Sequence, residues 1–205
     1  IPLAEASGAM IPIGDHALRE ACGQAKRWLD AGRTISLAVN LSVTQLQQPD
    51  LVERIGAIVK QSGLPPRLLE LEITESGAMQ NPETSIRMLY DLKKLGIRIS
   101  LDDFGTGHSS LSYLKRFPID TLKIAQSFVS GIPDDSGDIA LIEAMISMSR
   151  ALGLDVIAEG IETEAQRSFL IASGCRYGQG YLVGKPVPAD EFTELYLRRP
   201  ISAGA

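Results

Sequence analysis

The sequence predicts one α/β domain over residues 1–205, a TIM-like (β/α) barrel that lacks its first two strands. Short apolar strands alternate with amphipathic helices, which is typical of a mostly parallel sheet covered by helices. The strands start about 30 residues apart, the size of one βαβ unit. Each predicted strand also has a conspicuous polar residue near its C-terminal end, which favours a shared site on one face of the sheet.

Six short apolar segments have strand character: 34–41, 68–74, 97–103, 120–125, 154–160 and 178–184. Five stretches with helical spacing precede or separate them: 15–30, 50–61, 82–96, 138–153 and 162–174. We expect Asp15 to cap the first helix. Pro82 at the start of the third helix, and Gly96 and Gly153 at two helix ends, follow the usual asymmetry of helix boundaries.

Composition limits the classes of partner. The 205 residues carry a net charge of −5, which argues against a chain-wide basic surface for a nucleic-acid polymer. An acidic protein can still bind an anionic substrate if metal ions supply the positive charge. No apolar run approaches the roughly 18 residues of a membrane span, so we expect no membrane contact by this domain.

The polar residues near the strand ends differ in type but share this position: Asn40, Glu72, Asp102 with Asp103, Lys123, Glu159 and Gln179. In a (β/α) barrel the C-terminal ends of the strands form the face that carries the chemistry. An open doubly wound sheet would gather such residues only at its switch point. Six consecutive strands contributing to one site therefore favour a ring, and a full ring of eight strands would place two more upstream.

Four of these side chains are hard oxygen donors: Asn40, Glu72, Asp102 and Asp103. Such donors suit Mg²⁺ and Mn²⁺. Two metal ions about 3.5–4 Å apart are the usual device for phosphodiester hydrolysis. Lys123 would add positive charge or hold the attacking water, and Glu159 and Glu162 add carboxylates, one of them a candidate base.

Less specific interpretations compete with this site. Taken singly, an acid is more often surface charge than ligand, and Glu70 with Glu72 could form a solvated edge. Polar groups at all six strand ends are harder to explain by solvation. The loop from Gly105 to Ser110 can adapt around a metal-bound phosphate, although a turn with a helix cap explains it better than a phosphate-binding loop. His16 and His108 each lack a second histidine at ligand spacing, so we expect no zinc site.

Several motifs occur in order through nearly the whole chain: VNLS (39–42), LEITES (71–76), DDFGTGHSSLSYL (102–114), DTLKI (120–124), AEGIET (158–163) and QGYLVGKP (179–186). Together they resemble the EAL-domain family, bacterial phosphodiesterases that linearise cyclic di-GMP to pGpG. The motif set is highly specific. The resemblance implies a metal-dependent hydrolase in bacterial second-messenger signalling, located in the cytoplasm or on a membrane-anchored protein.

The resemblance also implies roles for matching positions. Four residues resemble the ligands of two Mg²⁺ or Mn²⁺ ions: Asn40, Glu72, Asp102 and Asp103. Lys123 resembles the residue that orients the nucleophilic water, and Glu159 a further metal-site or base carboxylate. Glu75 resembles the glutamate that steadies the loop after DDFG. The remaining substrate or loop positions are expected to be Glu162, Gln179, Gly105 and Gly107.

Two departures from the family pattern stand out. Family members usually have aspartate after LKI, where this chain has Ala125. The Glu-Ala-Leu motif is absent, and residues 1–8 resemble the stretch just downstream of it. We expect upstream sequence to hold the first two strands, a metal-ligating glutamate and a substrate-binding arginine, so residues 1–205 alone should be impaired.

Two other functions remain open from the sequence. A degenerate domain could bind cyclic di-GMP as a receptor without cleaving it, or could serve as a dimerisation module of a signalling protein. The intact DDFGTG loop and ligand set favour catalysis for the intact domain. The resemblance further implies a homodimer and attachment to sensor or other signalling domains.

Overall fold

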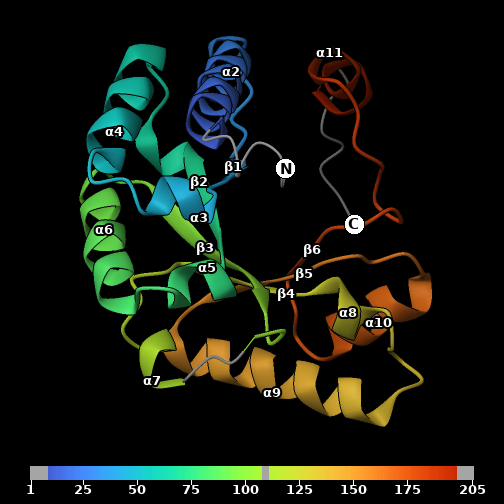
Figure 1. Cartoon of the computed structure of the whole chain (residues 1–205). Helices are drawn as coiled ribbons and strands as arrows, with labels where there is room; N and C mark the ends of the chain where they lie inside the picture. The colour runs from blue at the N-terminus through green and yellow to red at the C-terminus, as the bar shows by residue number, and fades with distance from the viewer. Residues whose placement is uncertain (1–8, 108–110, 198–205) are drawn as a thin grey trace.

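The computed structural model describes residues 9–107 and 111–197. The segment at 1–8, which was compared with the family motif, and His108 in the loop after DDFG therefore lie outside the described residues. Within these described ranges, six parallel strands form one sheet in sequence order, β1 to β6. Their bounds are β1 Leu37–Asn40, β2 Leu69–Thr74, β3 Arg98–Phe104, β4 Thr121–Ile124, β5 Asp155–Ala158 and β6 Tyr177–Gly178. The strands curve into a half-barrel with helices around it, which confirms the predicted fold class (Figure 1).

Five longer helices separate the strands or precede them: α2 Met10–Asp30, α4 Leu51–Ser62, α6 Pro82–Lys94, α9 Ser136–Leu152 and α10 Glu164–Ala172. Shorter helical elements follow several strand ends or close the described chain: α3 Val43–Leu46, η1 Pro66–Leu68, α5 Glu75–Met79, α7 Leu111–Leu114, α8 Gln126–Val129, α11 Ala189–Phe192 and η2 Thr193–Leu197. Helices α2, α4, α6 and α9 follow one another around the outside of the strands (Figure 1). No described helix has the length and apolar content needed to cross a bilayer.

The sheet has an apolar outer face and a polar inner face. Side chains alternate along a strand, so residues two apart point to the same side. On β2, Leu69, Leu71 and Ile73 are buried in the core between sheet and helices. Glu70 and Glu72 on the same strand point into the half-barrel, so they are not a solvated outer edge. The core thus lies outside the ring of strands and leaves its interior free for polar groups.

Helix boundaries follow the predictions closely, except at the first helix. Gly153 ends α9 in the left-handed conformation, with φ of 72°. Asp15 does not cap the first helix, because α2 already begins at Met10. Asp15 instead lies within α2, where its carboxylate is 3.3 Å from the guanidinium of Arg54 on α4. Its position is therefore explained by an ion pair between helices.

The predicted strand at 178–184 is largely wrong. Strand β6 ends at Gly178, and the sheet's hydrogen bonding to β5 ends with the Gln179 N–H, which donates to the Ala158 carbonyl at 2.9 Å. The chain then turns, and the N–H groups of Val183 and Gly184 both donate to the Gly180 carbonyl. These backbone groups are bonded within the turn and cannot extend the ladder.

We predict that Leu71→Ala lowers the free energy of unfolding by about 3 kcal/mol, because it leaves a cavity in the fully packed outer core. Chemical denaturation of the variant and the wild type measures this loss. Leu141→Ala on α9 is the matched control, since Leu141 is 47% exposed and should change stability by no more than about 0.5 kcal/mol. Equal losses from the two variants would contradict the assignment of the core to the outer face.

Candidate active site

The half-barrel gathers four charged side chains at the C-terminal ends of neighbouring strands. Glu72 lies on β2, Asp102 on β3 and Lys123 on β4, while Glu159 directly follows β5. All four point to the polar inner face. Each of these residues lies near the end of its strand, so the charged groups meet where the chain passes from the sheet into a loop.

Lys123 is the centre of this cluster. Its Nζ is 2.6 Å from Glu159 Oε1, 2.8 Å from Glu72 Oε2 and 3.2 Å from Asp102 Oδ1. Only 3% of the lysine side chain is exposed. Burial alone would lower the pKa of Lys123, but the hydrogen bonds to Glu159 and Glu72, together with the nearby charges of Glu72 and Asp102, outweigh burial and raise that pKa. The lysine is therefore a fixed cation.

The carboxylates of the cluster are not neutralised by one ammonium. Burial raises the pKa of Glu72 and of Glu159, and the nearby charge of Asp102 raises both further against the opposing effect of Lys123. Burial and Asp102 also raise the pKa of Asp103. Crowded carboxylates resist ionisation unless positive charge is added. This surplus of negative charge fits a site for divalent cations.

The backbone at Asp103 brings a further carboxylate to the site. Asp103 has a φ of 54°, a left-handed conformation that aspartate tolerates better than most residues. The register between β3 and β4 shifts between Leu101 and Phe104, so the chain at the two aspartates departs from the regular ladder. As a result, oxygens of Asp102, Asp103 and Glu159 all lie within 4.8 Å of one another. Such a set of hard donors suits Mg²⁺ or Mn²⁺.

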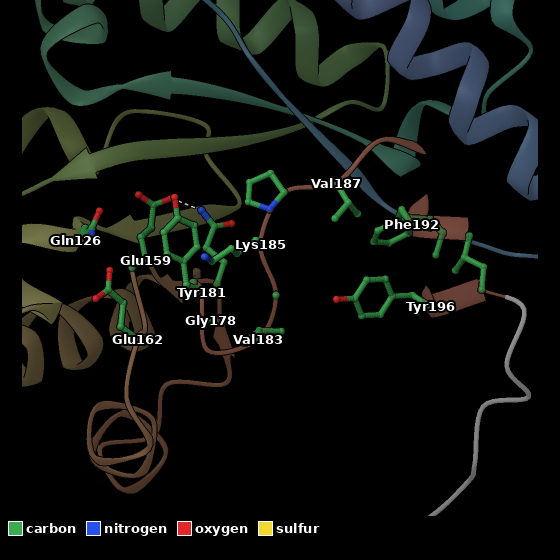
Figure 2. Close-up of a pocket in the computed structure, with 17 residues that line it drawn as sticks. Gln126, Glu159, Glu162, Gly178, Tyr181, Val183, Lys185, Val187, Phe192 and Tyr196 are labelled. Carbon is green, nitrogen blue, oxygen red and sulfur yellow. Dashed lines mark hydrogen bonds between the residues drawn. The ribbon is translucent and has the colours of Figure 1, made fainter. Parts of the chain in front are cut away.

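Asn40, Gln179 and Glu162 lie at the edges of this cluster. Asn40 ends β1 and pairs in register with Glu72, so it shares the inner face, but it is exposed and stands outside the ion cluster. Gln179 Nε2 donates to Glu159 Oε1 at 2.7 Å. Glu162 is exposed, and Figure 2 shows it beside Glu159 on the same wall of a pocket.

That pocket extends away from the acids and has a volume of about 930 Å³. Glu159, Gln179 and Glu162 line one end, where Tyr181 also lies beside Glu159, whereas the other end has an apolar and aromatic wall made by Val187, Phe192 and Tyr196 (Figure 2). The indole N–H of Trp28 on α2 donates to Thr193 Oγ1 at 2.8 Å and thereby holds the η2 segment in place. This wall could not be predicted from the sequence, because no periodic pattern marks residues that meet only through the turn after β6.

Gln126 is another pocket residue that the sequence analysis missed, although its place two residues beyond Ile124, at the end of β4, was a usable signal. Ala125 between them is buried and is the N-cap residue of α8, where it offers no side-chain cap. The departure from the family pattern at Ala125 thus lies beside the charged cluster, one strand end away from Glu159.

Glu75 anchors the loop after β3. It is the first residue of α5 and is 2% exposed, and its Oε2 accepts a hydrogen bond of 2.8 Å from the Gly105 N–H. Gly105 has a φ of 95°, which favours glycine. At Gly107 a Cβ atom would lie 2.8 Å from Glu75 Oε1, so this position requires a glycine while Glu75 keeps its place. Residues 108–110 of the predicted phosphate-adapting loop lie outside the described residues.

An acid-rich cluster around one buried lysine, set at the C-terminal ends of parallel strands, defines a barrel-type α/β protein with a candidate cation site. The comparison with protein families gives this class a name. The EAL domain family matches residues 1–186, and the chain belongs to that family.

Individual relatives agree with this assignment. The chain is 45% identical over 200 residues to signaling protein YkoW of Bacillus subtilis, covering 98% of this chain and 25% of YkoW. It is 44% identical over 192 residues to MucR of Pseudomonas aeruginosa, a bifunctional diguanylate cyclase and cyclic di-GMP phosphodiesterase, covering 93% of this chain and 28% of MucR. The chain therefore spans only about a quarter of the length of these curated relatives.

Solved structures share the fold. The MucR phosphodiesterase in complex with c-di-GMP superposes with a TM-score of 0.90 at 44% identity, covering 93% of this chain and 78% of that one. A manganese and cyclic di-GMP complex of BlrP1 from Klebsiella pneumoniae gives a TM-score of 0.76 at 29% identity, covering 83% of this chain and 43% of that one. The sheet and its helices thus follow an architecture shared by these relatives.

We predict that Glu75→Ala leaves the Gly105 N–H without its acceptor and lowers the free energy of unfolding by about 1–3 kcal/mol. Hydrogen exchange at the Gly105 amide should accelerate more than exchange in the strands. Glu143→Ala on the exposed face of α9 is the control and should change neither quantity. Unchanged exchange at Gly105 in Glu75→Ala would show that Glu75 does not hold the loop.

Proposed function

We propose that this chain is the main part of one cyclic di-GMP phosphodiesterase domain, with residues 1–205 belonging to that single domain. The substrate is cleaved at one phosphodiester to give linear pGpG, with two Mg²⁺ or Mn²⁺ ions as cofactors. The observation that carries the proposal is the buried Lys123 within 3.2 Å of three carboxylates, beside a fourth from Asp103. The c-di-GMP complexes of MucR and BlrP1 support the substrate, and the manganese of BlrP1 supports the metal.

Different residues of the chain have different roles in the proposed reaction. Four side chains would hold the two ions: Asn40, Glu72, Asp102 and Asp103. When bound, the ions supply positive charge that stabilises the in-line displacement at phosphorus and promotes the ionisation of water. Asp102 and Asp103 are adjacent in sequence and can each serve a different ion or share one.

Lys123 and Glu159 act on the attacking water. Lys123 remains a cation and orients the water oxygen toward phosphorus, while Glu159 is placed to accept a proton from it. The water oxygen forms the new bond to phosphorus, one P–O bond to ribose breaks, and a proton reaches the departing ribose oxygen. Because Lys123 already contacts Glu159 at 2.6 Å, both groups can reach the same water.

The pocket beside the acids offers room for the rest of the substrate. Gln179 and Glu162 line the pocket beside Glu159, so they can contact parts of the dinucleotide next to the scissile phosphate. Glu75, through Gly105 and Gly107, fixes the loop that begins directly after the aspartates. We assign these five residues to substrate binding or loop support.

The direct test is hydrolysis of cyclic di-GMP by the full native polypeptide that contains this chain. Turnover to pGpG is expected with Mg²⁺ or Mn²⁺, poor turnover with Ca²⁺ because its coordination is longer and looser, and none with EDTA. Full activity in EDTA would contradict the metal mechanism. Binding of cyclic di-GMP without turnover under any metal would favour the receptor function instead.

Asp102→Asn should lower turnover by at least ~10²-fold, the scale of removing a group that stabilises developing charge, while leaving the fold intact. The amide keeps the shape of the carboxylate but not its charge, so the thermal midpoint should change little. Asp91→Asn is the matched control, because Asp91 pairs with Lys94 on the exposed face of α6. Near-normal turnover in Asp102→Asn together with a loss in Glu72→Gln would refute the role given to Asp102.

We further propose that residues 1–205 alone are impaired. In the described part of the chain, β1 and β6 are the two ends of the sheet and each has one unpaired edge. Unpaired edges favour association or partial unfolding. Residues 1–205 should therefore hydrolyse cyclic di-GMP much more slowly than the full native polypeptide under the same metal conditions, and equal rates would contradict this expectation.

The wider setting is also a proposal. The small share of YkoW and MucR that the chain covers supports attachment to sensor or other signalling domains. We propose that the domain acts in the cytoplasm and forms a homodimer near the loop after β3. Sedimentation of the full native polypeptide with and without cyclic di-GMP tests the homodimer, which a purely monomeric species would exclude.

A further inference from the structure

A second ion network lies inside the half-barrel, toward the N-terminal ends of the strands, and Arg98 is its centre. Arg98 Nε is 3.2 Å from Glu70 Oε2 on β2, and Nη2 is 2.9 Å from Asp155 Oδ2 on β5. The same Nη2 also donates to Thr121 Oγ1 on β4 at 3.2 Å. One guanidinium on β3 therefore contacts three other strands.

The two networks use the same four strands. Each strand gives one residue to each network: Glu70 and Glu72 at β2, Arg98 and Asp102 at β3, Thr121 and Lys123 at β4, and Asp155 and Glu159 at β5. In each pair the two residue numbers differ by two or four, which is why both side chains reach the inner face. The network around Arg98 and the network around Lys123 are therefore connected through the same four backbone segments.

Regular backbone hydrogen bonding between β3 and β4 is interrupted beside the network around Lys123. Ser100 and Leu101 of β3 pair in register with β4, but the register shifts between Leu101 and Phe104, where Asp102 lies. Ladder hydrogen bonds therefore do not fix the distance between Asp102 and Lys123 directly. The contact from Arg98 to Thr121 joins the same two strands just below that irregularity.

Arginine is suited to joining several strands because its planar guanidinium presents hydrogen-bond donors in fixed directions. We propose that Arg98 is a positioning residue that sets the spacing of Glu72, Asp102 and Lys123 by locking their strands together from below. The inference rests on the proposed function, because the spacing matters through metal binding and turnover. Arg98 touches none of the proposed metal ligands and has no direct part in the chemistry.

The test compares Arg98→Met with wild type in the full native polypeptide. Two quantities are measured: the kcat for cyclic di-GMP, and the affinity for Mn²⁺ by electron paramagnetic resonance of the free ion without substrate. Groups that support metal ligands from behind typically change affinity or activity by 10–100-fold, so we expect about a tenfold loss in each. Arg98→Lys should retain only part of the kcat and of the Mn²⁺ affinity, because one ammonium cannot contact three strands as the guanidinium does.

Lys93→Met is the matched control. Lys93 on α6 binds both oxygens of Asp120 at 2.6 and 2.7 Å, next to the start of β4 but on the outside of the sheet. The lysine side chain is 31% exposed and that of Arg98 37%, so each variant removes a partly exposed cation from an ion pair. Only Arg98→Met should weaken Mn²⁺ binding and lower kcat. In an Asp155→Asn background the effect of Arg98→Met should shrink, because the two residues share one network.

The outcomes separate the two claims. If the wild type binds Mn²⁺ but does not hydrolyse cyclic di-GMP, the proposed function fails, and the Mn²⁺ affinities of the variants still decide the role of Arg98. If Arg98→Met matches Lys93→Met in Mn²⁺ affinity and in kcat, the positioning role is overturned even though the phosphodiesterase stands. Absence of Mn²⁺ binding by the wild type overturns both.

Discussion

The contact of one buried ammonium with three carboxylates is the constraint on which the rest of this structure depends. Buried charges are tolerated only when they are paired, and Lys123 pairs with acids from β2, β3 and β5 at once. Each of these strands must therefore present its charged residue at the same height. The apolar alternate residues, such as Leu71 and Leu122, bind the helices outside and keep that height fixed.

The contact between Lys123 and three carboxylates also leaves negative charge at the site unbalanced. A single cation cannot balance Glu72, Asp102, Asp103 and Glu159. Burial, together with the nearby charge of Asp102, raises the pKa values of the other three acids. The irregular backbone at Asp103 increases the crowding, since it turns a second aspartate toward the first and toward Glu159. A chain that folds this way holds negative charge ready for a divalent cation. In the proposed phosphodiesterase, that cation is what allows an acidic protein to accept a phosphate.

The sequence was sufficient for the order of the elements and for the face on which the charged residues meet. Leucine alternating with glutamate on 69–72 already distinguishes the outer core from the interior, and strand ends in a parallel sheet must face one way. The strand expected at 178–184 was wrong because its apolar residues belong to a turn, in which Gly180 accepts two backbone hydrogen bonds. Asp15 was misassigned because its partner Arg54 lies on another helix. The four oxygen ligands could be predicted from their residue type and their position at the strand ends, whereas the role of Glu75 came from the resemblance to a family.

Contacts made by long side chains between strands could not be predicted from the sequence. The reach of Arg98 to Thr121 and Asp155 depends on the strand register and on the curvature of the sheet, and neither follows from local pattern. The aromatic wall of Phe192 and Tyr196 likewise depends on the docking of η2 against Trp28. These features arise only when distant segments are placed together, so they mark the limit of prediction from composition and periodicity.

The central claim, that the acids around Lys123 form a divalent-metal site, can be tested by anomalous scattering from crystals of the full native polypeptide grown with Mn²⁺. The account predicts two anomalous peaks roughly 3.5–4 Å apart, with their nearest protein ligands among Asn40, Glu72, Asp102 and Asp103. The claim would be contradicted by crystals grown with Mn²⁺ in which the strand ends are ordered but no anomalous peak lies within bonding distance of Asp102.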